Sequence, residues 1–345
     1  MDVVKSFDDI FLDCTSLGVK LKTEEYAVSG QYAIVDQGQH DIAGYTDRTE
    51  GVYADVPAII FGDHTRVIKY IDQPLFLGAD GVKLLKAKEE SANYKYLYYA
   101  LRSIRIPNTG YNRHFKWLKE SQIEYPDAET QQKVVDTLDK VIGIITIRKQ
   151  QLSDFDTLIK ARFMELFGNP ITREKDEELK ALGDYCDLKA GKFVKASDIV
   201  ENNVEGLYPC FGGNGQRGFV SDYTHDGDFP IIGRQGALCG NVQYASGKFH
   251  ATEHAVVVTP RIEMDRYWLY YLLLQLNLNR YATGAAQPGL AVSNLEKIHV
   301  SVPKLSLQKK FADFARQSDK SKLAVQQSLE KTQELFDSLM QKYFG

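Results

Sequence analysis

Two long stretches without an internal proline decide the fold that this sequence predicts. Residues 126–168 read PDAETQQKVVDTLDKVIGIITIRKQQLSDFDTLIKARFMELFG, and residues 303–345 read PKLSLQKKFADFARQSDKSKLAVQQSLEKTQELFDSLMQKYFG. At 1.5 Å a residue, each stretch would form a helix roughly 55–60 Å long, far beyond a typical globular helix. Apolar residues recur in alternating steps of four and three, which keeps one stripe facing a partner helix. The two stretches are therefore predicted to pair as a coiled coil.

The predicted stripe can be followed residue by residue. In the first stretch it is apolar except at two arginines and consists of Val134, Leu138, Val141, Ile145, Arg148, Leu152, Phe155, Ile159, Arg162 and Leu166. In the second it is weaker in the middle and consists of Phe311, Ala315, Ser318, Lys322, Val325, Leu329, Thr332, Phe336, Leu339 and Tyr343. The alternative is a pair of unrelated surface helices on one globular core. The equal lengths of the two stretches favour pairing.

The two stretches end two copies of one longer unit, because the preceding sequence also repeats. Residues 7–10 correspond to 182–185, and residues 97–101 (LYYAL) correspond to 269–273 (LYYLL). A constant offset then connects five residues with five others: Leu118, Pro126, Gln131, Phe167 and Gly168 match Leu295, Pro303, Gln308, Phe344 and Gly345. The chain is therefore predicted to be an internal duplication.

Each copy begins with a part that is rich in glycine, aromatic residues and β-branched runs, which predicts short strands. Helices are expected around 94–104 and 265–278. The predicted segments are a globular domain at 1–126, a helix at 127–169, a second domain at 170–303 and a second helix at 304–345. The predicted fold class is α+β, with two pseudo-twofold-related globular domains joined by two long antiparallel helices.

Composition sets wide limits on function. The length of 345 residues suffices for two domains, and 43% hydrophobic with 26% charged residues is ordinary for a soluble protein. A net charge of −4 neither favours nor excludes nucleic-acid binding. The first residues lack the apolar core of a signal peptide, and the longest apolar run, 267–278, is too short to span a bilayer. With four cysteines and no C-x-x-C pair, a cytoplasmic protein with reduced thiols is expected.

The chain resembles the specificity subunits of type I restriction–modification systems along essentially its whole length. The resemblance rests on the order of domain, long helix, domain and long helix, and on local strings. These strings are NTGYNRHFKWLKE at 108–120, IGRQGALCG at 232–240, and the Pro-x-x-x-x-Gln opening of each long helix, Pro126 to Gln131 and Pro303 to Gln308. Their order along a duplicated chain makes the resemblance specific.

The resemblance implies a non-catalytic subunit that binds double-stranded DNA. Each globular domain would be a target-recognition domain that reads half of a bipartite site. The helices would set the spacer and dock two methylation subunits, and motor-nuclease subunits would complete the complex. S-adenosylmethionine, ATP and Mg²⁺ would bind those partners, with no cofactor in this chain. The sequence agrees, since it contains neither an Asn/Asp-Pro-Pro-Tyr methylation motif nor the G-x-x-x-x-G-K-[ST] motif of ATPases.

Candidate DNA contacts follow from basic and polar loops. Segment 94–119 holds six basic residues and no acidic one, and there we predict mainly phosphate contacts by Arg113, His114, Lys116 and Lys119. Gln and Asn suit adenine and Arg suits guanine in the major groove. Base contacts are therefore predicted for Gln37, Gln39, His40 and Arg48 in the first copy, and for Asn214, Gln216, Arg217, Arg234, Gln235 and Gln287 in the second. The alternative for each is an ordinary turn or helix-end residue.

Four apolar residues of the first long helix lie off its stripe: Val135, Ile142, Ile144 and Phe163. A pair of helices would not need these four residues in its contact stripe, so we predict that they bind the partner subunits. The alternative is that they pack under the globular domains of their own chain.

Two other classes of function were weighed. An enzyme with duplicated β-rich domains would place matching carboxylates or nucleophiles in both copies, and none align. A coiled-coil scaffold without DNA binding would have featureless domains, whereas these carry Arg and Gln in glycine-rich loops. Residues 250–254 (HATEH) match the spelling of an inverted zinc-peptidase motif. The apolar run that follows predicts a strand, which would separate the two histidines by roughly 13 Å, so no metal site is predicted.

Overall fold

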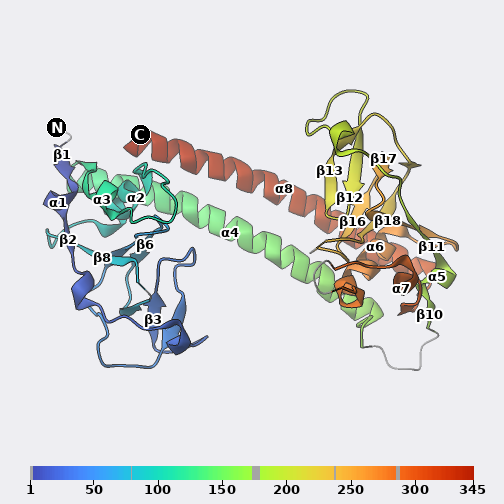
Figure 1. The fold of residues 1–345 in the computed structure, drawn as a ribbon, viewed down its shortest axis with the longest axis horizontal. Coiled ribbons are helices and arrows are strands. Elements are labelled where there is room, and N and C mark those ends of the chain that lie inside the picture. Colours follow the sequence, from blue (N-terminus) through green and yellow to red (C-terminus); the bar gives the residue numbers. More distant parts are fainter. Residues whose placement is uncertain (1–2, 79, 173–178, 237, 285–287) are drawn as a thin grey trace. The chain divides into compact units, whose positions relative to one another are not determined.

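The computed structural model describes residues 3–78, 80–172, 179–236, 238–284 and 288–345. The chain forms two compact units, which we call unit 1 (Met1–Lys149 and Gln327–Gly345) and unit 2 (Gln150–Gln326). Two unbroken helices of 40 residues, α4 (Ala128–Phe167) and α8 (Leu305–Phe344), connect them (Figure 1). Helix α4 begins in unit 1 and ends in unit 2, and α8 does the reverse. Each unit therefore holds part of both helices.

The described part of unit 1 forms three small sheets and three short helices. One sheet has the order β2 (Phe11–Asp13), β8 (Val82–Ala87), β5 (Ala58–Gly62) and β6 (Ile68–Ile71). The second is β4 (Gly44–Thr46), β3 (Tyr32–Val35) and β7 (Leu75–Leu77), and the third pairs β1 (Val3–Ser6) with β9 (Gln122–Tyr125). The helices are α1 (Phe7–Ile10), α2 (Tyr94–Ser103) and α3 (Phe115–Lys119), with 3₁₀ turns at Thr15–Leu17 and Thr23–Glu25.

Unit 2 repeats this plan, with one additional strand in its second sheet. Its first sheet has the order β11 (Cys186–Ala190), β18 (Ala255–Pro260), β15 (Phe229–Gly233) and β16 (Val242–Ala245). The second is β13 (Gly215–Val220), β12 (Tyr208–Gly212), β17 (Lys248–Ala251) and β14 (His225–Asp226), and the third pairs β10 (Lys180–Ala181) with β19 (His299–Val300). The helices are α5 (Leu182–Tyr185), α6 (Arg266–Gln275) and α7 (Val292–Glu296), with 3₁₀ turns at Ala196–Asp198 and Leu278–Tyr281. The predicted duplication and the α+β fold class are confirmed.

The apolar stripes predicted for the two long helices are covered in the folded chain. Every residue placed on either stripe is buried or half-buried, including Arg148 and Arg162 in α4 and Lys322 in α8. A spacing of three and four residues keeps these side chains on one face of each helix, which explains their common burial. Among the described residues, no helix has an apolar stretch long enough to cross a lipid bilayer.

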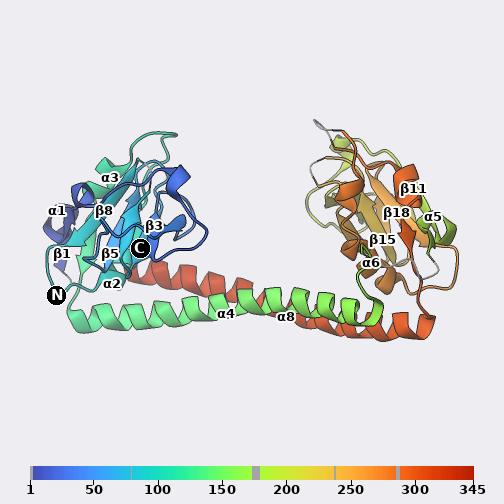
Figure 2. The same ribbon diagram turned by 90° about the horizontal axis from the view of Figure 1, so that it is seen from below.

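In unit 1, α2 forms a middle layer between the larger sheet and the long helices (Figure 2). Asn93 caps α2 by accepting a hydrogen bond from the backbone N–H of Tyr96 at 3.1 Å. The apolar face of α2 packs into one core with Leu138 of α4 and Phe336 of α8. A hydrogen bond adds to this packing: the hydroxyl of Tyr99 in α2 donates to Asp139 of α4 at 2.5 Å. Burial and this carboxylate raise the pKa of Tyr99 above its usual range, so the phenol stays neutral.

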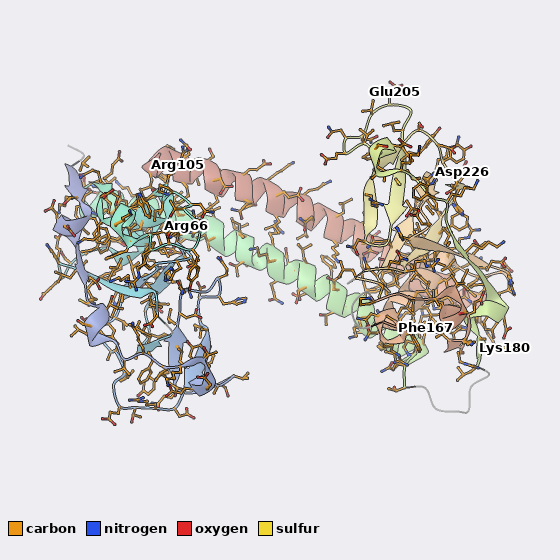
Figure 3. All side chains as sticks on the ribbon, viewed as in Figure 1. Arg66, Arg105, Phe167, Lys180, Glu205 and Asp226 are labelled. Atoms are coloured by element: carbon orange, nitrogen blue, oxygen red, sulfur yellow. The ribbon has the colours of Figure 1, made fainter. Side chains whose placement is uncertain are left out.

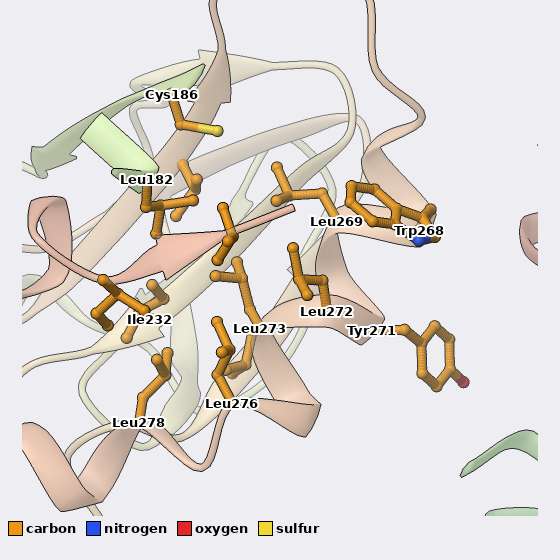
Figure 4. Packing of buried hydrophobic residues seen from close by; sticks show 14 of the residues in the cluster. Leu182, Cys186, Ile232, Trp268, Leu269, Tyr271, Leu272, Leu273, Leu276 and Leu278 are labelled. Atoms are coloured by element: carbon orange, nitrogen blue, oxygen red, sulfur yellow. The ribbon is translucent and has the colours of Figure 1, made fainter. Parts of the chain in front are cut away.

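Unit 2 uses α6 in the same way. Leu269, Leu272 and Leu273 of α6 pack in one core with Leu182, Cys186 and Ile232, whereas Tyr271 points away from them (Figure 4). The hydroxyl of Tyr271 donates to Asp319 of α8 at 2.6 Å. Tyr99 and Tyr271 are equivalent in the repeat, so each unit fastens its middle helix to a long helix by the same type of bond.

The Pro-x-x-x-x-Gln strings form hydrogen bonds at the start of each long helix, where it packs against its globular part. The Nε2 group of Gln131 donates to the carbonyl of Pro126 at 2.8 Å, and that of Gln308 donates to Pro303 at 2.7 Å. Both glutamines are buried, with 4% and 1% of their surface exposed. The Oε1 atom of Gln308 also accepts from the backbone N–H of Asp265, the residue that caps α6. These glutamines connect the first turns of each long helix to the segment before it, and buried polar groups of this kind are normally hydrogen-bonded.

Candidate nucleic-acid interface

Four loops of unit 1 meet at one end of its sheets, and we call this region the loop end of unit 1. They join β3 to β4, β5 to β6, β7 to β8 and α2 to α3. Gln37 connects the first three, because its Nε2 donates to the carbonyl of Asp80 at 3.1 Å and its Oε1 accepts from the N–H of His64 at 3.2 Å. The hydroxyl of Thr65 adds a bond of 2.6 Å to the Gln37 carbonyl. The amide of Gln37 is thus engaged within the fold, and its base contact stays a prediction.

His114 ties the α2–α3 loop to the same region from inside. Its side chain is fully buried, and its Nδ1 lies 2.9 Å from the carbonyl oxygen of Asp63. The backbone N–H groups of His114 and Phe115 donate to the carbonyl and to Oδ1 of Asp63 at 2.8 and 2.7 Å. The predicted contact between His114 and DNA is therefore corrected: the imidazole has no exposed surface, and it positions the loop.

The α2–α3 loop carries an exposed aromatic ring that the sequence analysis did not select. Tyr111 is 85% exposed and stacks on His64 with ring centroids 4.5 Å apart and planes at 6°. His64 is held in turn through its Nδ1, 3.2 Å from the carbonyl oxygen of Asn112. Arg113 follows as an exposed cation. The hydrogen bond from Lys20 lowers the pKa of Asp80, and the positive charge of Arg113 lowers this pKa further. The loop thus presents a supported flat ring beside a positive charge.

The remaining predicted residues of unit 1 are not all brought together. Gln39 and His40 lie exposed on the β3–β4 loop, where the buried ammonium of Lys69 donates to the His40 carbonyl at 2.6 Å. Arg48 lies beyond the other end of that hairpin and donates to the Glu50 carbonyl at 3.0 Å, so it is separated from the loop end. Lys116 covers the ring of Trp117 at 4.2 Å and stays exposed.

Lys119 is the last of the predicted cations in the basic segment. It lies on α3 and forms an ion pair with Asp8 of α1 at 3.4 Å. Both side chains are substantially exposed, at 46% and 67%, so the pair contributes little to stability. Its positive charge is nevertheless partly compensated, which makes Arg113 and Lys116 the stronger candidates for phosphate contacts.

The loop end of unit 2 is built from the equivalent four loops. The N–H of Arg234 donates to the His254 carbonyl at 3.0 Å, and the N–H of Leu290 donates to the Arg234 carbonyl at 2.8 Å. Backbones approach closely here, because a Cβ atom on Gly233 would lie 1.8 Å from the carbonyl oxygen of Gly213. Only glycine permits that approach. The sequence string around residue 233 therefore shapes the loop end.

Five of the six predicted residues of unit 2 gather at this loop end, from the β12–β13 turn, the start of β13 and the start of the β15–β16 loop. Asn214, Gln216, Arg217 and Gln235 are exposed, and Arg234 is half-buried. The Nε atom of Arg234 is buried and has no hydrogen-bond partner among the described residues. The sixth, Gln287, lies outside the described residues. Exposed amide and guanidinium groups thus lie near a glycine-framed backbone.

The string at 250–254 does not form a single helical face. His250 lies on β17 with its Nε2 3.3 Å from the Lys192 carbonyl oxygen, while Glu253 and His254 lie in the turn before β18. The Nε2 of His254 is 3.1 Å from Oε1 of Glu253. Within the described ranges, no group of three or more His, Cys, Asp or Glu side chains is placed to hold a metal ion.

The four apolar residues predicted to bind partners differ in exposure. Val135 and Phe163 are 3% and 0% exposed and belong to the cores of unit 1 and unit 2, which corrects their prediction as partner contacts. Ile142 is half-buried against the core of unit 1, and Ile144 is 45% exposed. The sequence analysis missed other exposed apolar residues of the long helices, namely Ile147, Leu158, Leu323 and Leu335.

Comparisons with known proteins agree with this architecture. The family model described as "Type I restriction modification DNA specificity domain" matches residues 4–154 and 174–335. A curated relative, the specificity subunit of the type I restriction enzyme EcoprrI of Escherichia coli, is 41% identical over 184 residues, 52% of this chain and 45% of that subunit. The match thus spans less than half of that relative's length.

Solved structures share the fold over nearly the whole chain. The crystal structure of the S subunit of a type I restriction-modification system from M. genitalium has a TM-score of 0.69 at 19% identity, covering 99% of this chain and 96% of that chain. A structure described as the structural basis of complex assembly and conformational transition of the type I R-M system has a TM-score of 0.54 at 18% identity, with 97% of each chain covered. At these identities the likeness concerns the fold.

Proposed function

The chain belongs to the family of type I restriction modification DNA specificity domains, and on this premise we propose that its two loop ends each read one half of a bipartite DNA site. The observation that carries the proposal is the recurrence of the same four-loop arrangement in unit 1 and unit 2. Loops on a rigid scaffold are where recognition residues concentrate. Two equivalent loop ends provide two equivalent readers, which is what a site with two specified elements requires.

The chemistry of the loop ends supports this proposal. Asn214, Gln216, Arg217 and Gln235 of unit 2 offer the paired donors and acceptors that match adenine and guanine edges in the major groove. In unit 1, Arg113 and Lys116 offer charge to phosphates, and Tyr111 offers a flat ring. Phosphate contacts position a protein on the duplex, whereas base contacts specify sequence.

Removing two exposed cations of unit 1 tests the proposal. For R113A/K116A we expect affinity for duplex DNA to fall by about tenfold at moderate salt, and the slope of log K against log salt to flatten by about two. The measurement is a gel shift with a duplex pool of random sequence, repeated over a series of salt concentrations, with and without a co-expressed methylation subunit.

The control variant is Lys140→Ala, which removes an exposed lysine of α4 in unit 1. It should leave both quantities unchanged. If the wild-type complex fails to shift any duplex, the proposed function is wrong. If R113A/K116A binds DNA like the wild type, these two residues are not contacts.

We further propose that the long helices dock two methylation subunits and set the spacer between the half-sites. Their exposed apolar residues support this, because contiguous apolar groups in water indicate an interaction surface. Ile144 and Ile147 are 45% and 59% exposed and lie three residues apart, hence on one face of α4. S-adenosylmethionine, ATP and Mg²⁺ would bind the methylation and motor-nuclease subunits. This chain would contribute recognition without a catalytic residue.

Charge placed on that face of α4 tests the docking proposal. In I144D/I147D we expect co-purification of a methylation subunit with the chain to fall at least about tenfold, because both buried carboxylates would lack partners. Thr146 lies exposed between the two isoleucines on a different face, so T146D should assemble normally. The thermal unfolding midpoint of each variant, measured alongside, distinguishes lost docking from lost folding. Normal assembly of I144D/I147D would contradict this docking face.

A further inference from the structure

Unit 1 contains a cavity of about 590 Å³ beside its loop end, between the β5–β6 loop and the residues that follow α2. Three arginines line it: Arg66 from the loop, Arg102 from the end of α2 and Arg105 just beyond it. Figure 3 labels Arg66 and Arg105. Gln39 lines it as well, and Asp41 is the single carboxylate in its lining. The cavity wall therefore carries a net positive charge, which is the electrostatic requirement for an anion.

The arginines differ in how many contacts their guanidinium groups make within the chain. Arg102 donates to the hydroxyl of Tyr98 at 3.1 Å and lies over the rings of Tyr98 and Phe336. Arg105 is exposed, and among the described residues no hydrogen bond or ion pair engages its guanidinium. Arg105 thus brings free donors to the cavity on a side chain suited to planar recognition of a phosphate.

Arg66 adds two independent observations. Its backbone has φ of 62°, the left-handed region that a long side chain rarely adopts, and such strain persists where the fold over-determines a position. Its Nη1 donates to the Ile106 carbonyl at 3.2 Å, but its Nε is buried without a hydrogen-bond partner in the described part of the chain. A buried N–H that lacks a partner requires an acceptor from elsewhere.

The repeat provides an internal comparison. The equivalent position of unit 2, between the β15–β16 loop and the residues after α6, has a cavity of about 340 Å³. By the offset of the repeat, Leu274 stands there for Arg102 and Asn277 for Arg105. Among its described lining residues no side chain is charged. The arginines are therefore not needed to build the fold at this place, and they mark a property of unit 1 alone.

We propose that the Arg66–Arg102–Arg105 cavity is a phosphate-binding site, and that its ligand is a backbone phosphate of the DNA read by unit 1. Phosphate matches the charge of the wall, the free donors of Arg105 and the unpaired Nε of Arg66. The assignment to DNA rests on the proposed function. The consequence is an asymmetry: unit 1 contributes a phosphate anchor lined by three arginines, and unit 2 binds without an equivalent one.

The test uses the full chain, with its methylation subunit if the complex is needed for stability, and two probes. The first is inorganic phosphate, titrated into the protein and followed by calorimetry. The second is a duplex of mixed sequence, for which the salt slope of binding is measured. In Arg105→Gln we expect loss of phosphate binding, a fall in duplex affinity of about three- to tenfold and a salt slope smaller by about one. Arg105→Lys keeps the charge and should retain the salt slope.

Lys140→Gln removes one exposed charge of unit 1 outside the cavity and serves as the matched control. If R105Q loses phosphate binding but keeps the wild-type salt slope, the cavity takes free phosphate and its assignment to DNA is overturned. If R105Q changes neither titration, the phosphate site itself is overturned. If the wild type binds phosphate but no duplex at all, the proposed function fails while the phosphate site stands.

Discussion

Replacing Phe163 by alanine is expected to destabilise unit 2 by about 3–5 kcal/mol, the usual cost of emptying the space of a buried aromatic ring. Phe163 is fully buried on α4. Its ring centroid lies 5.0 Å from that of Phe167 and 5.3 Å from that of Phe311 of α8. Loss of this ring removes contacts within α4 and between α4 and α8, so chemical denaturation of the chain should show an early transition.

Leu158→Ala supplies the matched control for Phe163, because Leu158 lies on the same part of α4 but is 50% exposed. Its expected cost is below about 1 kcal/mol. If F163A unfolds like the wild type and instead loses its methylation subunit, Phe163 is a partner contact and its assignment to the core is mistaken.

The second large effect is expected at the loop end of unit 2. The triple variant N214A/Q216A/R217A should bind its cognate duplex at least about 100-fold more weakly, because each good bidentate base contact contributes about 1–3 kcal/mol. All three residues are exposed, so the unfolding midpoint should hardly change. Mapping of methylated positions in a host that carries the intact system first provides the cognate duplex.

The variant N202A/N203A alters two exposed residues of a different loop in unit 2 and should bind like the wild type. The triple variant should lose discrimination in one half-site and keep it in the other, since unit 1 is untouched. Equal loss at both half-sites, or no loss, would show that the β12–β13 turn is not a reader.

The features that sequence predicted well are those with a local or repeating signature. A spacing of three and four residues places Leu138 and Phe336 on the apolar stripes of their helices, and both residues are buried. The constant offset from Pro126 and Gln131 to Pro303 and Gln308 indicated the duplication directly. The equivalent hydrogen bonds of the two glutamines explain why both copies have the Pro-x-x-x-x-Gln string.

The features that sequence missed depend on contacts between distant segments. His114 was taken for a DNA contact because it stands among cations, but the Asp63 carbonyl, 51 residues away, holds it inside. Val135 and Phe163 were assigned to partners because a two-helix seam had no place for them, whereas α2 and α6 add a third layer that covers them. Arg66 and Arg105 lie 39 positions apart in the chain, and only the fold brings them to one cavity.

The discontinuity of unit 1 has a consequence for synthesis. Unit 2 is one uninterrupted piece, Gln150–Gln326, whereas unit 1 needs Gln327–Gly345 to complete its core. A ribosome delivers those residues only after the whole of unit 2, so until then the first part of unit 1 has Val134 and Leu138 incompletely covered. The later-made unit can finish folding earlier, which reverses the usual order in which domains mature during translation.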